Sequence, residues 1–570
     1  MRKVFSVFLQ VIVPVSAFIF WAGHFEKNIL NVFFLLFLYV LAYFLCCVFF
    51  PQIKMNTRIL LTTGVVAGLG GSLILGTFYT PHETYDGAYF HTKVINSVIA
   101  NGKYEPLFET TKPYPVEYLM GFIGKFSGYA VINFVYAATG IISILLTFKL
   151  LQKLGTKESA ALFLSGVLFT SPVFFNLAFS DYKVDIFLYL VTVSSYLIFL
   201  KMMEENKYKI MPLLGLFLGL GVLIKIGFAP IAAVIGTITF YEFVFVQKQK
   251  NLILPISLLV FTILPVVLWG CYFGIKIPLF QKTIAQKHQE VLRVNPTVTD
   301  ACYTDLKVYD LATYSKETRF PAYLLQPLYY LAGNNMDPVG FQANNTLSSF
   351  LYIGVFFSLL WPLTKEYSNK KNLYVFLIYV TYLLSFLFTV GAIYWYLLPV
   401  LPLSLFFFYR VLAASVSKAA LKRIILVVAV DSILLLTVVL LNYRQDIEIN
   451  KDEDKKNREF SKYLQENTEG LILDTSFLQT PVMYPYFTDS QNRIVKTDFI
   501  FADTSLDNKN IYTILEKENI NYLITNMEVS VKYPQGECLA RYKEGLKNFL
   551  NTYTDTVYED DRGYVVSKLK

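Results

Sequence analysis

Apolar runs of about 20 residues follow one another along most of this chain, and they constrain its fold more than any other feature. A helix needs roughly 20 mostly apolar residues to cross a bilayer. The run at 211–246 is too long for one span, and Lys225, Gly227 and Pro230 interrupt it, so we expect two spans there. The pattern predicts a polytopic α-helical membrane protein with about thirteen spans, at 4–22, 29–50, 58–79, 128–150, 158–178, 183–203, 211–226, 228–246, 252–274, 348–365, 372–391, 393–412 and 421–441.

Composition and charge separate this membrane body from a C-terminal soluble part. Apolar residues make up 55% of the chain and charged residues 16%, whereas a soluble protein carries about 25% charged residues. Residues 446–570 nevertheless hold 22 of the 42 acidic residues. The positive excess elsewhere is typical of a membrane body that faces anionic lipid, so nucleic acid is not implied as a partner.

We therefore expect six parts. They are N-terminal transmembrane helices (1–79), a first outer loop (80–127), a transmembrane core (128–274), a large outer loop (275–347), C-terminal transmembrane helices (348–441) and an extracytoplasmic domain (442–570). The outer assignment comes from Lys and Arg, which gather in alternate short connections and mark the cytoplasmic side. The expected protein is a multi-pass plasma (inner) membrane protein with a cytoplasmic N-terminus, and its chemistry takes place outside. Its richness in Lys, Asn, Ile, Phe and Tyr indicates a bacterial gene.

The C-terminal part shows mixed α/β periodicity. Two short buried strands are predicted at 471–474 and 521–525, a last strand at 563–566, and a helix at 508–517 before the second strand. It has no Gly-rich phosphate loop. We interpret it as an α/β domain that is structural or docks the acceptor.

The first outer loop has features that a simple connection between two spans does not need. Asp86 stands directly after the end of a span, among aromatic residues. Residues 86–100 are amphipathic at helical spacing, which is typical of a helix lying in the membrane interface. Pro113 and Pro115 then open a second such helix at 116–126. Side chains of this segment that could line a substrate site are Tyr85, Tyr89 and His91.

Four motifs, taken in order, resemble a known superfamily. The loop has Asp86, Tyr89 and Gly102 and then Lys112-Pro-Tyr-Pro115, and Ser180-Asp-Tyr-Lys-Val-Asp185 opens a later span. Gly215-Leu-Phe-Leu-Gly219-Leu ends at Lys225, and Tyr396-Leu-Leu-Pro399-Val-Leu-Pro402 follows near the last spans. These motifs resemble those of the polyprenyl-phosphate-dependent glycosyltransferases of the GT-C superfamily. The similarity is to the branch that contains the protein O-mannosyltransferases and the aminoarabinose transferase of lipid A.

The chain also departs from that superfamily's pattern. Asp86-Gly87 stands where the acidic pair is usual, and Trp395 replaces the Arg before Tyr396. Two additional spans precede the loop. The resemblance still implies a membrane glycosyltransferase, transferring a hexosyl or a pentosyl group, with Tyr396 near the substrate.

Residue chemistry points the same way. The outer compartment lacks nucleotide sugars, and the cytoplasmic connections are too short to hold a nucleotide-binding domain, so a sugar donor must arrive attached to lipid. Transfer needs a carboxylate that takes the acceptor's hydroxyl proton and cations that hold the departing phosphate. Asp86 fits the first role and Lys112 the second. The alternatives are that Asp86 only caps the following helix and that Lys112 is a snorkelling interfacial lysine.

A second carboxylate, Asp185, is expected at the outer mouth of its span, where a bare charge is costly unless it is paired or functional. Its partner could be Lys183 or a substrate hydroxyl, and simple helix capping remains open. Lys225 could contact a phosphate or a carboxylate, or it could snorkel outward beside a helix break. We therefore treat Asp185 as a candidate catalytic residue and Lys112, Lys183 and Lys225 as candidate donor-phosphate ligands.

No cofactor is firmly indicated. A divalent ion could bind His82, Glu83, Asp86 and His91, although their spacing matches no defined metal motif. The five cysteines, at 46, 47, 271, 302 and 538, show no C-x-x-C spacing, which excludes a disulfide scaffold or a zinc ribbon.

Two functions of different classes remain. In the first, the protein transfers a sugar from a polyprenyl-phosphate donor to a lipid, glycan or protein acceptor, by a single inverting displacement with Asp86 as general base. In the second, it is a transporter or flippase of a lipid-linked saccharide. A transporter predicts inverted repeats and charges near the membrane midplane. The ionisable residues here gather near the outer ends of the spans, which favours the enzyme.

Overall fold

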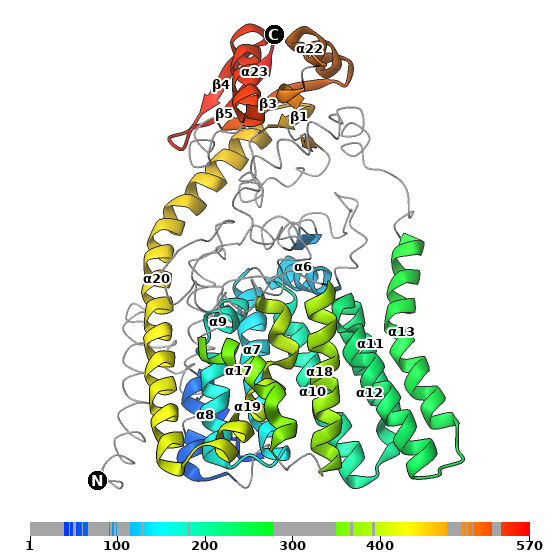
Figure 1. Cartoon of the computed structure of the whole chain (residues 1–570). Coiled ribbons are helices and arrows are strands. Elements are labelled where there is room, and N and C mark those ends of the chain that lie inside the picture. The colour runs from blue at the N-terminus through cyan, green and yellow to red at the C-terminus, as the bar shows by residue number, and fades with distance from the viewer. Residues whose placement is uncertain are drawn as a thin grey trace.

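The computed structural model describes most of the chain from residue 115 onward and scattered residues before it. The described residues are 39–66 with gaps, 91, 94–95, 98–99, 115–127, 129–179, 183–276, 349–364, 369–389, 394–475, 493–496, 500–503, 505–526 and 537–570. They form a helical bundle, one long helix that rises along its side, and a small sheet domain at the far end of that helix (Figure 1).

Each of the ten spans expected from residue 128 onward coincides with a helix or with a pair of consecutive helices. Five of these, or six when a bent pair is counted as one span, are long and apolar enough to cross a membrane. The expected spans before residue 80 lie largely outside the described residues, so the total of thirteen stays a prediction. The helices are α7 (Tyr129–Lys153), α8 (Glu158–Phe169), α9 (Pro172–Phe179), α10 (Asp185–Glu205), α11 (Met211–Ile224), α12 (Ala229–Tyr241), α13 (Ile253–Lys276), α17 (Ser349–Phe357), α18 (Lys370–Thr389), α19 (Leu401–Ser415) and α20 (Lys418–Asn467).

One expected span is bent, and one long apolar run divides into two helices. Helices α8 and α9 meet at an angle of 71° where one span was expected at 158–178. The apolar run at 211–246 divides as expected, because Lys225 leaves the helical conformation with φ −155° and ψ 119°. A 3₁₀ turn (Ile226–Phe228) then leads into α12, whose Pro230 stands at a position where a missing N–H costs nothing.

The glycines of the 215–225 motif let α11 pack tightly against α13. A Cβ atom on Gly215 would lie 2.4 Å from the carbonyl oxygen of Leu258, and one on Gly219 would lie 2.3 Å from that of Thr262. Small residues four apart allow such close backbone approach between membrane helices. The motif therefore fixes α11, and with it the position of Lys225 at the end of α11.

Charged residues clamp the bundle at the end opposite the sheet domain. Glu204 at the end of α10 pairs with Lys153 of α7 at 2.7 Å and with Lys371 of α18 at 2.9 Å. Glu242, just after α12, pairs with Lys370 and accepts a hydrogen bond from Tyr374. These contacts join α7, α10, α12 and α18 at this end of the bundle.

Helix α20 is the connection between the membrane body and the sheet domain. It is 50 residues long and shows no break at residue 442, where the last domain was expected to begin. Phe460 and Leu464, near its end, are fully buried against the sheet. One helix therefore provides both the last expected span and part of the soluble domain's core (Figure 1).

The sheet domain has five strands in the order β2-β1-β3-β5-β4. Strands β1 (Leu471–Asp474), β2 (Ile494–Lys496) and β3 (Ile520–Asn526) are parallel, whereas β4 (Thr554–Glu559) and β5 (Tyr564–Leu569) pair antiparallel. Helix α20 covers one face, and α22 (Asn508–Lys517) and α23 (Glu537–Tyr553) pack with the core of the other. The expected α/β domain is present, with its three predicted strands and its helix.

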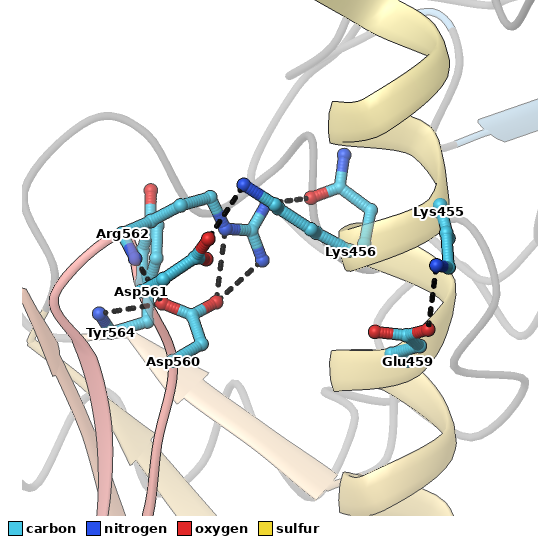
Figure 2. A network of polar contacts seen from close by, with 8 residues as sticks. Lys455, Lys456, Glu459, Asp560, Asp561, Arg562 and Tyr564 are labelled. Atoms are coloured by element: carbon cyan, nitrogen blue, oxygen red, sulfur yellow. Dashed lines mark hydrogen bonds and ion pairs between the residues drawn. The ribbon is translucent and has the colours of Figure 1, made fainter.

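A polar network fixes the β4–β5 turn to α20 (Figure 2). Arg562 donates to Asp560 Oδ2 at 2.6 Å and 2.9 Å and to Asn457 Oδ1 of α20 at 2.6 Å. Lys456 pairs with Asp561 at 2.8 Å, and its hydrogen bond lowers the pKa of that carboxyl. Gly563 closes the turn with φ 76°, a conformation that side chains rarely adopt. The sheet domain is thus held to the helix by charge as well as by apolar packing.

Candidate functional site

The candidate site lies at the end of the bundle that faces the sheet domain, where helix α6 (Pro115–Ser127) is found (Figure 1). This helix was expected at 116–126 as the second interfacial helix of the first outer loop. A Cβ atom on Gly121 would lie 2.8 Å from the carbonyl oxygen of Ile95 and 2.5 Å from Cβ of Val98. The two helical segments of the loop therefore touch backbone to backbone at Gly121.

The apolar face expected for residues 86–100 is buried where the structure describes it. Ile95 and Val98 are fully buried, Val94 is 4% exposed, and Ile99 packs against the main core. This burial agrees with a segment that lies on the bundle rather than in solvent. The remaining residues of that segment, Asp86 and Tyr89 among them, lie outside the described residues.

His91 and Glu117 form a side-chain hydrogen bond that joins the two segments of the loop. The Nδ1 atom of His91 contacts Oε1 of Glu117, across 26 positions of sequence. Glu117 is 1% exposed, in the first turn of α6, where the helix dipole favours a negative charge. Sequence reasoning selected His91 but missed Glu117. The sequence feature that could have pointed to Glu117 is its position in the first turn of a helix that follows Lys112-Pro-Tyr-Pro115.

Asp185 and Lys225 form an ion pair at this end of the bundle. The Lys225 ammonium donates to Asp185 Oδ1 at 2.6 Å, and the two side chains are 19% and 3% exposed. Asp185 is the first residue of α10 and Lys225 follows the last residue of α11. Both charges therefore complement the dipole of their own helix. Of the alternatives open for Lys225, the structure shows the carboxylate contact.

Lys183 is a further lysine near the start of α10. It is two residues before Asp185 and is only 1% exposed. A buried lysine is costly unless its charge is compensated or used. The partner expected for Asp185 was Lys183 or a substrate hydroxyl, whereas the ion pair of Asp185 is with Lys225.

The motif at 396–402 packs against the middle of α10. Tyr196 of α10 donates a hydrogen bond to the carbonyl oxygen of Pro399 at 3.1 Å, inside a 3₁₀ segment (Tyr394–Val400). Tyr196 is about 16 Å along the helix from Asp185 at 1.5 Å per residue. The proline part of the motif therefore serves packing. The side chain of Tyr396 is not among the described residues.

Several expected site residues cannot be placed. His82, Glu83, Tyr85, Asp86, Tyr89 and Lys112 lie outside the described residues. Among the residues that the structure does describe, no group of three or more His, Cys, Asp or Glu side chains could hold a metal ion. The possible metal site near His82 therefore stays a prediction.

Comparison with known proteins bears directly on this end of the bundle. Residues 112–269 match the family described as dolichyl-phosphate-mannose-protein mannosyltransferase. That segment begins at Lys112 and includes α6, Lys183, Asp185 and Lys225. The expected GT-C resemblance is confirmed.

A likeness in fold to solved structures extends over 90% of the chain. A crystal structure of ArnT from Cupriavidus metallidurans bound to undecaprenyl phosphate matches with a TM-score of 0.56 at 13% identity, covering 90% of this chain and 98% of that one. The apo state of the same ArnT matches with a TM-score of 0.50 at 11% identity, covering 90% and 97%. No curated protein matches the chain by sequence. The chain therefore shares the fold of this ArnT over most of its length, and residues 112–269 match a mannosyltransferase family.

Proposed function

We propose that this protein moves a sugar from a polyprenyl-phosphate donor to an acceptor at the outer face of the membrane. Two findings support the donor class. ArnT, whose fold this chain shares, has been crystallised with undecaprenyl phosphate. The family matched by residues 112–269 is described by a dolichyl-phosphate sugar. Both molecules are polyprenyl phosphates.

The observation that carries the proposal is the Asp185–Lys225 pair. It joins two charges that are largely buried at the end of the bundle next to α6, within the segment that matches the family. A fixed ammonium at such a place can stabilise the charge that develops on a departing phosphate. In our proposal, Lys225, Lys183 and Lys112 hold the phosphate, and Asp185 positions Lys225.

The proposed reaction is a single displacement. Asp86 accepts the proton of the acceptor's hydroxyl group. The acceptor oxygen attacks the anomeric carbon of the sugar from the face opposite the phosphate. The bond between that carbon and the phosphate oxygen breaks, and the lipid phosphate leaves with the electron pair. One displacement inverts the configuration at the anomeric carbon.

The charge distribution supports the proposed orientation. Helix connections at the end opposite the sheet domain contain the pairs of Glu204 and Glu242 with lysines. Positive charge gathers on the cytoplasmic side of membrane proteins. We therefore place that end in the cytoplasm, and α6, the Asp185–Lys225 pair and the sheet domain outside.

Burial argues against the transporter alternative. In the described part of the bundle, the buried charged residues are Glu117, Lys183, Asp185 and Glu242, and each lies at or next to a helix end. Transporters instead place such charges near the midplane. Asp431 lies about 20 Å along α20 from Lys418 at 1.5 Å per residue, but it is only half-buried.

Mass spectrometry of outer-face glycans and glycoproteins, in cells with and without the protein, tests the proposal. We expect one sugar modification to disappear on deletion and to return with the wild-type gene. A variant with Asp86→Asn should express normally and fail to restore it. If glycans were unchanged, or if a lipid-linked saccharide accumulated on the inner leaflet, the transferase proposal would be wrong.

A further inference from the structure

The turn between α12 and α13, at the end of the bundle opposite the sheet domain (Figure 1), carries an exposed aromatic cluster of Phe240, Tyr241 and Phe245. A π-helical turn (Glu242–Val246) continues α12, and its hydrogen bonds join residues five apart, so such residues become neighbours. The ring of Phe245 accordingly lies 6.3 Å from that of Phe240 and 5.8 Å from that of Tyr241. Phe245 is 62% exposed.

The inner side of the same turn is fixed to the bundle. Glu242 is 2% exposed and pairs with Lys370 of α18. The ring of Phe243 lies 5.1 Å from that of Tyr208, which belongs to the 3₁₀ turn before α11. Because Glu242 and Phe243 face the bundle, the aromatic cluster is held on the outer surface.

Two lysines follow the aromatic cluster, and no acidic side chain neutralises them. Lys248 and Lys250 are both exposed, and the sequence has no Asp or Glu between Glu242 and Glu290. Glu242 is already paired with Lys370. Within the described part of the chain, neither Lys248 nor Lys250 forms an ion pair. The turn therefore presents positive charge directly beside exposed rings.

An apolar stripe on α13 starts at this turn and continues along the helix. Its side chains are three or four positions apart, which places them on one helical face, and each is at least 48% exposed: Ile253, Ile256, Val260, Ile263 and Val267. Only 17% of the most apolar part of this span is buried inside the protein. Since α13 is long and apolar enough to cross a membrane, the stripe faces acyl chains.

We propose that the turn binds an anionic phospholipid of the leaflet at this end of the bundle. Lys248 and Lys250 attract the lipid phosphate. The aromatic cluster lies at the level of the headgroups, where aromatic rings are enriched, and an acyl chain follows the stripe on α13. A phospholipid is the occupant that fits, because it joins a negative charge to a long apolar chain. This inference does not depend on sugar transfer.

Other lysines at the same end of the bundle have the charge without the apolar surface. Lys157, directly before α8, and Lys201, in α10, are also exposed. Between Ile142 and Leu213, however, the described residues include no exposed large apolar side chain. Replacing Lys157 and Lys201 therefore removes two positive charges on the same side of the membrane and serves as the matched control.

Native mass spectrometry of the full-length protein tests the site. The protein is delipidated in detergent and titrated with phosphatidylglycerol or with phosphatidylcholine of the same acyl chains. Lys248→Gln/Lys250→Gln should lower the affinity for phosphatidylglycerol by roughly 25-fold, at about five-fold per lysine, and leave that for phosphatidylcholine unchanged. Lys157→Gln/Lys201→Gln should bind phosphatidylglycerol as the wild type does. Equal affinities of the two double variants would overturn the proposal.

Two further measurements distinguish a lipid from other occupants. Phe245→Ala removes an exposed ring, so it should weaken both lipids alike and leave the unfolding temperature without lipid at the wild-type value. Glycerol phosphate, which has the charge without acyl chains, should not displace phosphatidylglycerol at equal concentration. Displacement would indicate a phosphate site and would overturn the proposal. So would a dimer of the chain that dissociates in Lys248→Gln/Lys250→Gln, because a second copy would then occupy the surface.

Discussion

The Lys225 ammonium lies 2.6 Å from the Asp185 carboxylate, although 40 positions separate the two residues in the chain. The start of α10 supplies the acid and the end of α11 supplies the base, so the pair exists only when these helices are packed. The glycine contacts pack α11 against α13 and so hold the end of α11 in place. The pair is thus a product of the fold at the point where we propose the donor phosphate to bind.

We expect Lys225→Met to lose both stability and donor binding. Asp185 would remain buried without its ammonium, and breaking a buried ion pair from one side costs about 3–5 kcal/mol. The double variant Asp185→Asn/Lys225→Met should recover most of the stability, because no buried charge is left unpaired. Its transfer activity should stay low if Lys225 holds the phosphate. Thermal unfolding and transfer are measured in nanodiscs for both variants. Full activity in the double variant would show that the pair is only structural.

We expect Gly219→Ala to destabilise the bundle, whereas Gly236→Ala should not. A Cβ atom at Gly219 would lie 2.3 Å from the Thr262 carbonyl oxygen, so α11 and α13 must separate. Overpacking of this kind costs about 1–3 kcal/mol. Gly236, in α12, has open space around it, and alanine there should stabilise the helix by up to about 1 kcal/mol. The unfolding temperatures of both variants and of the wild type are measured in the same detergent. Equal shifts would contradict the role assigned to the glycine motif.

Asp86→Asn should reduce transfer by about 10²- to 10⁴-fold, which is the usual contribution of a general base. The amide keeps the ability to cap a helix but cannot take a proton. Folding and donor affinity should therefore be preserved, and single-turnover rates in nanodiscs should fall. Asp555→Asn, on an exposed strand of the sheet domain, is the control and should transfer at the wild-type rate. If Asp86→Asn turned over like the wild type, Asp86 would have no part in the mechanism.

Lys112→Ala should weaken binding of the lipid donor more than it lowers stability. A phosphate ligand contributes to affinity, whereas a snorkelling lysine contributes mainly to packing at the interface. Two measurements in nanodiscs separate the two roles: the affinity for a polyprenyl-phosphate sugar and the unfolding temperature of each variant. Lys125→Ala, in the last turn of α6, is a matched control on the same loop. Equal affinity of Lys112→Ala and wild type would return Lys112 to the snorkelling interpretation.

The product should have the inverted anomeric configuration, so a β-linked donor should give an α-linked product. Retention needs a second carboxylate that attacks the sugar, and Asp185 is the candidate that we can name for that role. Its Oδ1 is already bound to Lys225, which suits a positioning role better than a nucleophile. The coupling constant of the product's anomeric proton by NMR decides this. A retained configuration would move Asp185 to the centre of the reaction.

Periodicity predicted the elements well wherever a segment is uniformly apolar or clearly alternating. The spans from residue 128 onward and strands β1, β3 and β5 belong to this class. Strand β2 has only three residues, and β4 exposes most of its side chains, so neither carries a pattern that stands out from a loop. The prediction ended the last span before residue 442, because the apolar pattern of the sequence stops there. It continues because the 50 residues contain no Gly or Pro to end it.

The sequence indicated which residues belong to the candidate site, but it did not indicate which of them contact one another. Asp185 and Lys225 stood out because charges near span ends are costly unless they are used. His91 stood out as a possible substrate-lining or metal-binding residue of the first outer loop. Their partners depend on contacts between helices far apart in sequence, such as Glu117 with His91, and no local pattern encodes these contacts. Glu117 itself resembles an ordinary acid in the first turn of a helix. Only its burial against the other segment of the loop distinguishes it.

Because α20 is unbroken, it fixes both the distance of the sheet domain from the membrane part and the domain's rotation about the helix axis. A helix of 50 residues is about 75 Å long, and a bilayer core takes up about 30 Å. Each residue inserted between the membrane part and Phe460 would raise the domain by about 1.5 Å and turn it by about 100°. Insertions of about whole helical turns would therefore change only the distance to the membrane. Insertions of other lengths would also turn a different face of the sheet toward the bundle.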